Sequence, residues 1–313
     1  MNIERMIATL RDSQAFSQYG ALLKSFLFSG HNETFPALSA GLVVFLTLVY
    51  IYSSTHPEII EKYSLAPSDL LSFKLNNLST YPLFHENFFH LLFNVVSLYK
   101  PLSQYERFNG TVHTGIVLNT LAALTGVAYS IIGFIFYPNI KILGSSGWCF
   151  AFFAFYSYYE SFHKPSIKIS SNIEIPTTLT PFIILIIMGF LVPNSSFIGH
   201  LISIFFGFLL ASGPIEKITE PPFEIVQKIE TYLAPLIDLI PSDYILFVKE
   251  SEIISKRHSR IENLAKNGGG SNVNVGTELP LFNTNSTKSS NSIEKQPQPS
   301  FKGEGVVLGS AED

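Results

Sequence analysis

Seven residues of this sequence have types and spacings suited to nucleophilic catalysis, although the stretches around them are strongly apolar. They are His85, His90 and Asn94, then Gly144, Ser146 and Gly147, and finally His200. A serine hydroxyl becomes an effective nucleophile when a neighbouring base removes its proton. Histidine, with an unperturbed pKa near 6.5, is the side chain best suited to that role. We therefore expect Ser146 to be a nucleophile and His200 to be its general base.

An acyl-transfer site also needs hydrogen-bond donors for the oxyanion that develops on the substrate. His90 and Asn94 are four residues apart, so they lie on one face of a helix. Their side chains and the backbone N–H of Ser146 are the expected donors. Glu86 is the only acid in the surrounding apolar stretches at that depth, so the pattern predicts a Ser–His dyad rather than a triad. Gly144 and Gly147 would allow a sharp turn and close helix contacts.

Each of these residues also has a purely structural interpretation. A serine such as Ser146 often packs in a helix contact and bonds a backbone carbonyl. His90 and Asn94 could bind each other or a water, and His85 could lie at the membrane interface. Histidines can also bind a metal, but no Glu or Cys joins these at ligand spacing. The structural interpretations would have to hold in three separate segments at once, so we favour the catalytic one.

The elements that must position these residues are membrane helices. Hydrophobic residues make up 47% of the 313 residues and charged residues only 14%, whereas soluble domains carry about 25% charge. A bilayer-spanning helix needs roughly 20 mostly apolar residues. Six such spans are expected, and Pro193–Ser196 divides the last two. They are Phe35–Ser54, Leu83–Leu102, Thr114–Tyr137, Ser145–Tyr159, and the two halves of Ile175–Ile215.

The order of the predicted spans brings the polar residues of the second, fourth and sixth spans together. With six spans, the second, fourth and sixth run in the same direction. The groups around His90, Ser146 and His200 then lie at similar depth on one side of the membrane. Lys and Arg are more frequent in the segments on the side of the N-terminus, which predicts cytosolic N- and C-termini. Glu58, Lys62 and Asp69 fall in a polar connection on the opposite side.

The expected domain organisation has four parts. Residues 1–34 form a cytosolic N-terminal segment, 35–213 a six-helix membrane domain, 214–262 a cytosolic, partly helical segment, and 263–313 a disordered low-complexity tail. Residues 223–254 place apolar residues near helical spacing, which predicts either a helix on the membrane surface or one packed on the bundle. The net charge of −4 gives no reason to expect nucleic acid as a partner, and one cysteine, Cys149, allows no intrachain disulfide.

These motifs resemble the rhomboid family of intramembrane serine proteases over about Phe35 to Ser212. The shared features are His85, His90 and Asn94 in the second helix, Gly144-Ser145-Ser146-Gly147 opening the fourth, and His200 followed by Ser203 and Gly207 in the sixth. Glu106 to Gly110 also resembles the family's Glu-x3-Gly turn. Ser203 and the aromatic residues after Gly147 depart from the usual glycines. The resemblance is greatest to the fungal members with six spans and a cytosolic tail.

The resemblance implies an all-α, rhomboid-like six-helix bundle that cleaves single-pass membrane proteins through an acyl-enzyme, without a cofactor. Ser146 and His200 would be catalytic, Asn94 and His90 would stabilise the oxyanion, and His85 would be structural. It also implies a Golgi membrane location, and the tail offers a site for a cytosolic partner. Two alternatives remain: an inactive relative that binds and escorts membrane proteins, and a transporter with a polar site. The intact dyad argues against the first, and the position of the histidines near one membrane face argues against the second.

Overall fold

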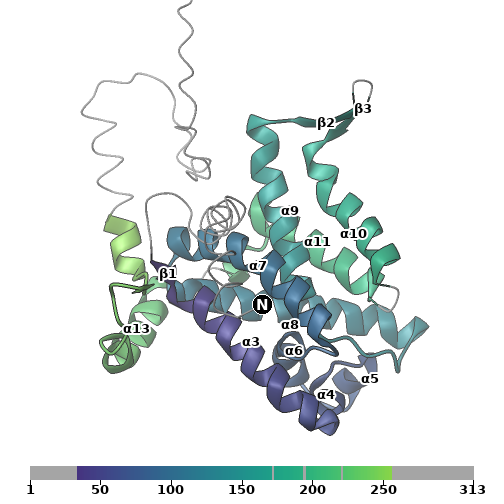
Figure 1. Ribbon diagram of the computed structural model, residues 1–313, viewed down its shortest axis with the longest axis horizontal. Coiled ribbons are helices and arrows are strands. Elements are labelled where there is room, and N and C mark those ends of the chain that lie inside the picture. Colours follow the sequence, from purple (N-terminus) through teal and green to yellow (C-terminus); the bar gives the residue numbers. More distant parts are fainter. Residues whose placement is uncertain (1–33, 171–172, 193–194, 220, 256–313) are drawn as a thin grey trace, which may run out of the picture. The chain divides into compact units, whose positions relative to one another are not determined.

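The structure, a computed structural model, describes residues 34–170, 173–192, 195–219 and 221–255. The predicted N-terminal segment, except residue 34, and the whole of the predicted disordered tail lie outside these residues. The described part belongs to one compact unit and is mostly helical. The six predicted spans correspond to six helices (Figure 1). They are α3 (Ala37–Thr55), α7 (Phe88–Asn109), α8 (Thr111–Phe136), α9 (Ser146–His163), α10 (Thr180–Leu191) and α11 (Phe197–Ser212).

Most helices begin and end close to the predicted limits, but α7 begins five residues later and ends seven residues later than the predicted span Leu83–Leu102. The second span was expected from Leu83, but α7 begins at Phe88, because the side chain of Asn87 accepts a hydrogen bond from the His90 backbone N–H and caps the helix. His85 and Glu86 therefore lie in the chain that leads into the helix. By length and composition alone, α3 and α8 are suited to cross a membrane, and α11 would join them if α11 and the helical segment that follows it were one bent span.

Short helices fill the connection between α3 and α7. They are α4 (Pro57–Tyr63), α5 (Pro67–Leu71), α6 (Asn77–Thr80) and the 3-10 turn η1 (Tyr81–Leu83). Asp69 holds this connection together by accepting hydrogen bonds from the Ala66 backbone N–H, the Asn77 amide and the Lys74 ammonium. Burial raises the pKa of Asp69, but these three bonds outweigh it and leave the pKa below the usual value.

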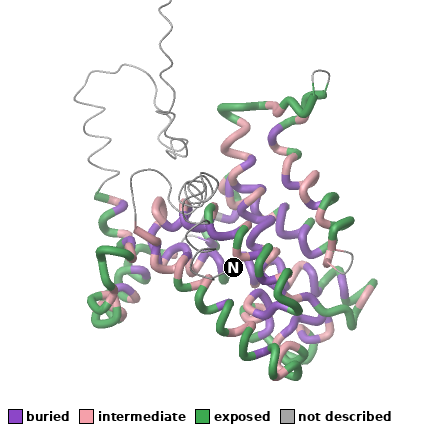
Figure 2. Tube along the Cα trace, viewed as in Figure 1, coloured by how far each residue is buried: buried purple, intermediate pink, exposed green. Residues whose placement is uncertain are grey.

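Helices α9 and α11 pack side by side along most of their length (Figure 1). The contact depends on the small residues of α11 that follow His200. A Cβ atom on Gly207 would lie 2.1 Å from the Ala151 carbonyl oxygen, so the two backbones are almost in contact there. Ser203 and Ala211 are buried on the same face. Figure 2 shows that buried residues follow the inner faces of these helices, while α3 has many exposed apolar residues.

At the opposite end of α7, a buried carboxylate joins three segments. Glu106 accepts hydrogen bonds from the backbone N–H groups of Leu38 and Ser39 at the start of α3, and from the hydroxyls of Ser39 and Thr111. Bonds from these N–H groups satisfy donors that the first turn of a helix leaves unpaired. Thr111 in turn accepts a hydrogen bond from the Val248 backbone N–H. The junction thus includes the C-terminal segment.

Two small sheets complete the described structure. Strand β1 (Phe35–Pro36) pairs in parallel with β4 (Ile245–Leu246), and β2 (Ser166–Ser170) pairs antiparallel with β3 (Ile173–Pro176) between α9 and the 3-10 turn η2 (Thr177–Leu179). Beyond α11 come α12 (Glu216–Thr219) and α13 (Phe223–Ile237). Helix α13 contacts α8 and buries Val226 and Glu230, so it packs on the bundle, which is one of the two arrangements expected from the sequence.

Candidate active site

The side chains of Ser146 and His200 meet across the contact between α9 and α11. The His200 Nε2 atom lies 2.8 Å from Ser146 Oγ, which is hydrogen-bond distance for proton transfer. Ser146 is the first residue of α9, so its backbone N–H points out of a helix N-terminus. The Ser196 side chain caps α11 by accepting a hydrogen bond from the Gly199 N–H, which places His200 in the first turn. His200 is buried, and Ser146 is partly exposed.

His90 and Asn94 line the approach to Ser146 from α7. A Cβ atom on Gly144 would lie 2.6 Å from the His90 Nε2 atom and 3.4 Å from the Asn94 Nδ2 atom. Gly144 also has a φ of +101°, a backbone conformation that side chains other than glycine rarely adopt. The glycine therefore lets the chain before Ser146 pass directly beside both side chains. Gly147 is a regular helical residue facing Ser203.

Two buried nitrogen atoms of the site have no hydrogen-bond partner within the described residues. They are Nδ2 of Asn94 and Nδ1 of His200. Since buried donors are normally paired, the Asn94 amide is an available donor beside the serine. The unpartnered Nδ1 of His200 means that no carboxylate of the described chain orients the imidazole. The arrangement can thus perform serine chemistry with two residues.

His85 lies behind the site rather than in it. Its ring is fully buried, and its Nε2 atom lies 3.2 Å from Ser145 Oγ and 3.4 Å from the Ser145 backbone nitrogen. The ring also meets His90 edge to face, with 5.1 Å between centroids. His85 therefore contacts both the residue before Ser146 and a predicted oxyanion donor. Within the described chain, no group of three His, Cys, Asp or Glu side chains could hold a metal ion.

Two residues of this region were not identified as site residues from the sequence. The ring of Phe150 lies against the ring of His200, with 4.5 Å between centroids and a tilt of 30°. Phe150 could have been placed at the site from the sequence, because it lies four residues after Ser146 and residues four apart share a helix face. The thiol of Cys149 lies 3.5 Å from the Asn94 carbonyl oxygen and is fully buried. Cys149 thus packs against the helix that carries Asn94.

Comparisons with a family model and with known proteins point to the same family. The family model described as the rhomboid domain matches residues 72–215, which contain all seven residues identified from the sequence. The chain is 37% identical to the rhomboid-type serine protease 2 of Yarrowia lipolytica, over 88% of this chain and 94% of that protein. It is 39% identical to the proteins of the same description from Eremothecium gossypii and Saccharomyces cerevisiae. Those alignments cover 91% and 84% of this chain, and 98% and 96% of the two proteins.

Proposed function

Because this chain belongs to the rhomboid family, we propose that it is an intramembrane serine protease in which Ser146 and His200 form the catalytic dyad. The 2.8 Å separation of Ser146 Oγ and His200 Nε2 is the observation that carries this proposal. The similarity to rhomboid-type serine proteases along most of the chain supports it. The substrates are proteins with a single transmembrane segment, and the reaction is hydrolysis of one of their peptide bonds.

The first half of the reaction forms an acyl-enzyme. Ser146 Oγ attacks the scissile carbonyl carbon while His200 Nε2 takes the hydroxyl proton. The carbonyl oxygen becomes an oxyanion, which accepts hydrogen bonds from Asn94 Nδ2, the ring N–H of His90 and the backbone N–H of Ser146. The tetrahedral intermediate then collapses, the C–N bond breaks, and His200 returns its proton to the leaving amine.

The second half restores the enzyme. A water molecule attacks the ester carbonyl and gives a proton to His200. The second tetrahedral intermediate releases the carboxylic acid, and the proton returns to Ser146 Oγ. Gly144 and His85 support both halves, since Gly144 leaves room for the donors and His85 holds Ser145 in place.

In the membrane, we place α3, α7, α8, α9, α10 and α11 as the six spans, with both termini in the cytosol. The distribution of Lys and Arg supports this orientation. The site then opens on the lumenal side, where water reaches it. A Golgi membrane is the proposed location, and the chain beyond α13 is the proposed site for a cytosolic partner. The Golgi location rests on resemblance to the fungal relatives, and the partner site rests on the sequence of the tail.

The proposal is tested by labelling the purified protein in detergent with a fluorophosphonate, which reacts with activated serines. Wild type should be labelled, and Ser146→Ala and His200→Ala should not. Ser161→Ala, a change on the same helix away from the site, should retain full labelling. A folded wild-type protein that remains unlabelled would contradict the dyad and favour the inactive escort function.

A further inference from the structure

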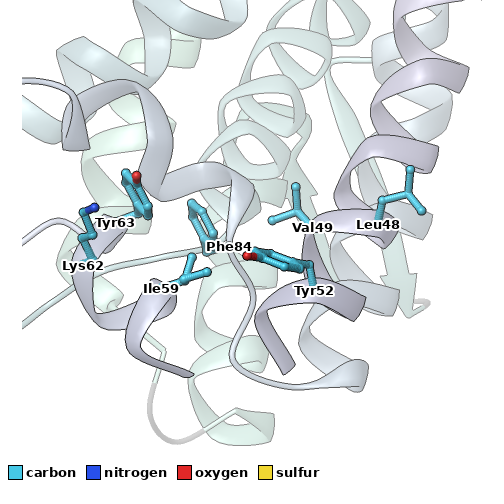
Figure 3. A pocket seen from close by; sticks show the side chains of 7 residues that line it. All are labelled: Leu48, Val49, Tyr52, Ile59, Lys62, Tyr63 and Phe84. Atoms are coloured by element: carbon cyan, nitrogen blue, oxygen red, sulfur yellow. The ribbon is translucent and has the colours of Figure 1, made fainter. Parts of the chain in front are cut away.

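A groove lies on the molecule between α3, α4 and the chain just before His85. It has a volume of about 530 Å³ and is open to the outside. Figure 3 shows its seven lining residues, which come from three segments that are separate in sequence. They are Leu48, Val49 and Tyr52 from α3, Ile59, Lys62 and Tyr63 from α4, and Phe84. None of them takes part in the proposed chemistry.

The walls of the groove are mainly apolar. Tyr63 and Phe84 stack with 5.4 Å between their ring centroids and an interplanar angle of 4°. Leu48 and Tyr52 are exposed on the outer side of α3, with 59% and 58% of their surface accessible. Helix α3 is one of the two described helices that are long and apolar enough to cross a bilayer. Its exposed apolar side is thus suited to contact with lipid chains, and the groove opens on that side.

A cationic group stands at the α4 end of the groove. The Lys62 Nζ atom lies 5.1 Å from the centroid of the Tyr63 ring. Glu58 lies one helical turn earlier, yet no ion pair within the described residues involves Lys62. By contrast, two lysines in the same region do form ion pairs: Lys74 pairs with Asp69, and Lys141 pairs with Glu61. The Lys62 ammonium is therefore available to an anion from outside the chain.

We propose that this groove binds a glycerophospholipid, with one acyl chain along Leu48 and Val49 and the phosphate on Lys62. The groove lies beside the last turns of α3, where a phospholipid headgroup is expected. Tyr and Lys side chains near the end of a membrane helix lie at the level of lipid headgroups. Two other occupants fit the groove less well. A free phosphate would bind Lys62 but make no use of the apolar wall, and an apolar substrate helix would contact the wall but make no use of the Lys62 ammonium.

The test uses the full-length protein reconstituted in phosphatidylcholine vesicles that contain a photoactivatable lipid. One probe is a phosphatidylcholine with a diazirine in its acyl chain, and the other is the matching diacylglycerol, which lacks the phosphate. After illumination, mass spectrometry locates the labelled peptides. The phosphatidylcholine probe should label the segment from Leu48 to Tyr63 preferentially over the outer face of α10.

Matched variants separate the phosphate contact from the apolar contact. Lys62→Gln should lower phosphatidylcholine labelling of this segment about fivefold and leave diacylglycerol labelling unchanged. Lys141→Gln removes a positive charge nearby and should change neither. Val49→Phe fills the groove and should lower labelling by both probes, whereas Val44→Phe, the same change on an exposed site of α3 outside the groove, should not.

Three results would overturn the proposal. They are equal phosphatidylcholine labelling of wild type and Lys62→Gln, labelling spread evenly over all lipid-facing helices, and displacement of the probe by a transmembrane substrate peptide. The last would identify the groove as a substrate site. Thermal unfolding of every variant checks that each one is folded, and it is independent of both lipid labelling and the proposed dyad.

Discussion

The His200 ring lies between two residues of α9: its face packs on the Phe150 ring at 4.5 Å, and its Nε2 atom meets Ser146 Oγ at 2.8 Å. Since its Nδ1 atom has no partner within the described residues, ring packing takes the place that a carboxylate has in a triad. With Ser146 and His200 as the proposed dyad, we expect Phe150 to act as a positioning residue that holds the imidazole at the angle needed for proton transfer.

Phe150→Leu should lower kcat about two- to tenfold, because an aromatic pair contributes about 0.5–1.5 kcal/mol beyond simple burial. Leucine keeps the residue apolar in a packed region, so the melting temperature should change little. Phe150→Tyr keeps the ring and should retain activity. The measurement is kcat and KM on a transmembrane peptide substrate. A drop confined to KM would instead assign Phe150 to substrate binding.

Gly144→Ala should abolish cleavage, since the added Cβ would meet the His90 ring at 2.6 Å in a backbone conformation unfavourable to alanine. The conformation alone costs about 1–2 kcal/mol. Fluorophosphonate labelling and thermal unfolding would measure the two effects. Gly189→Ala is the matched control, because nothing lies within 4 Å of its added Cβ. An active Gly144→Ala protein would show that His90 can move without cost.

Asn94→Ala should lower kcat by about 10²–10³ and leave KM nearly unchanged, because it removes a donor that acts in the transition state. Activity should be weakened and not lost, as the two other donors remain. Asn94→Asp keeps the size of the side chain but has no N–H donor, so it should be as impaired as the alanine variant. Recovery of activity in the aspartate variant would rule out the donor role.

Acidification should destabilise the connection between α3 and α7 through Asp69. Its pKa is lower in the folded protein than the usual 3.8, so its contribution to stability is present above that value and is lost as the pH falls through the folded pKa. The melting temperature should therefore drop below about pH 4. Asp69→Asn should show a shallower drop, and Glu58→Gln, an exposed change on α4, should follow wild type.

The sequence predicted the helical class, the approximate helix limits and the residues that meet at the site. Those predictions were possible because apolar runs define membrane helices and because polar residues are costly within them. The contact of His85 with Ser145 could not be predicted, since it depends on how the chain before α7 folds against the start of α9. The start of α7 was misplaced because capping by Asn87 is a local effect that hydropathy does not register. The six-span count and the cytosolic tail remain predictions.

The junction at Glu106 has a consequence for the order in which the protein is made. The bonds from Leu38 and Ser39 to Glu106 join residues 68 and 67 positions apart, so they can form once the first two long helices have been synthesised. The bond from Val248 to Thr111 spans 137 positions, and the pairing of Phe35 with Ile245 is longer still. These contacts must wait until the ribosome has almost finished the described chain. An interrupted translation product could thus contain Ser146 and His200 and still leave β1, just before α3, without its partner strand.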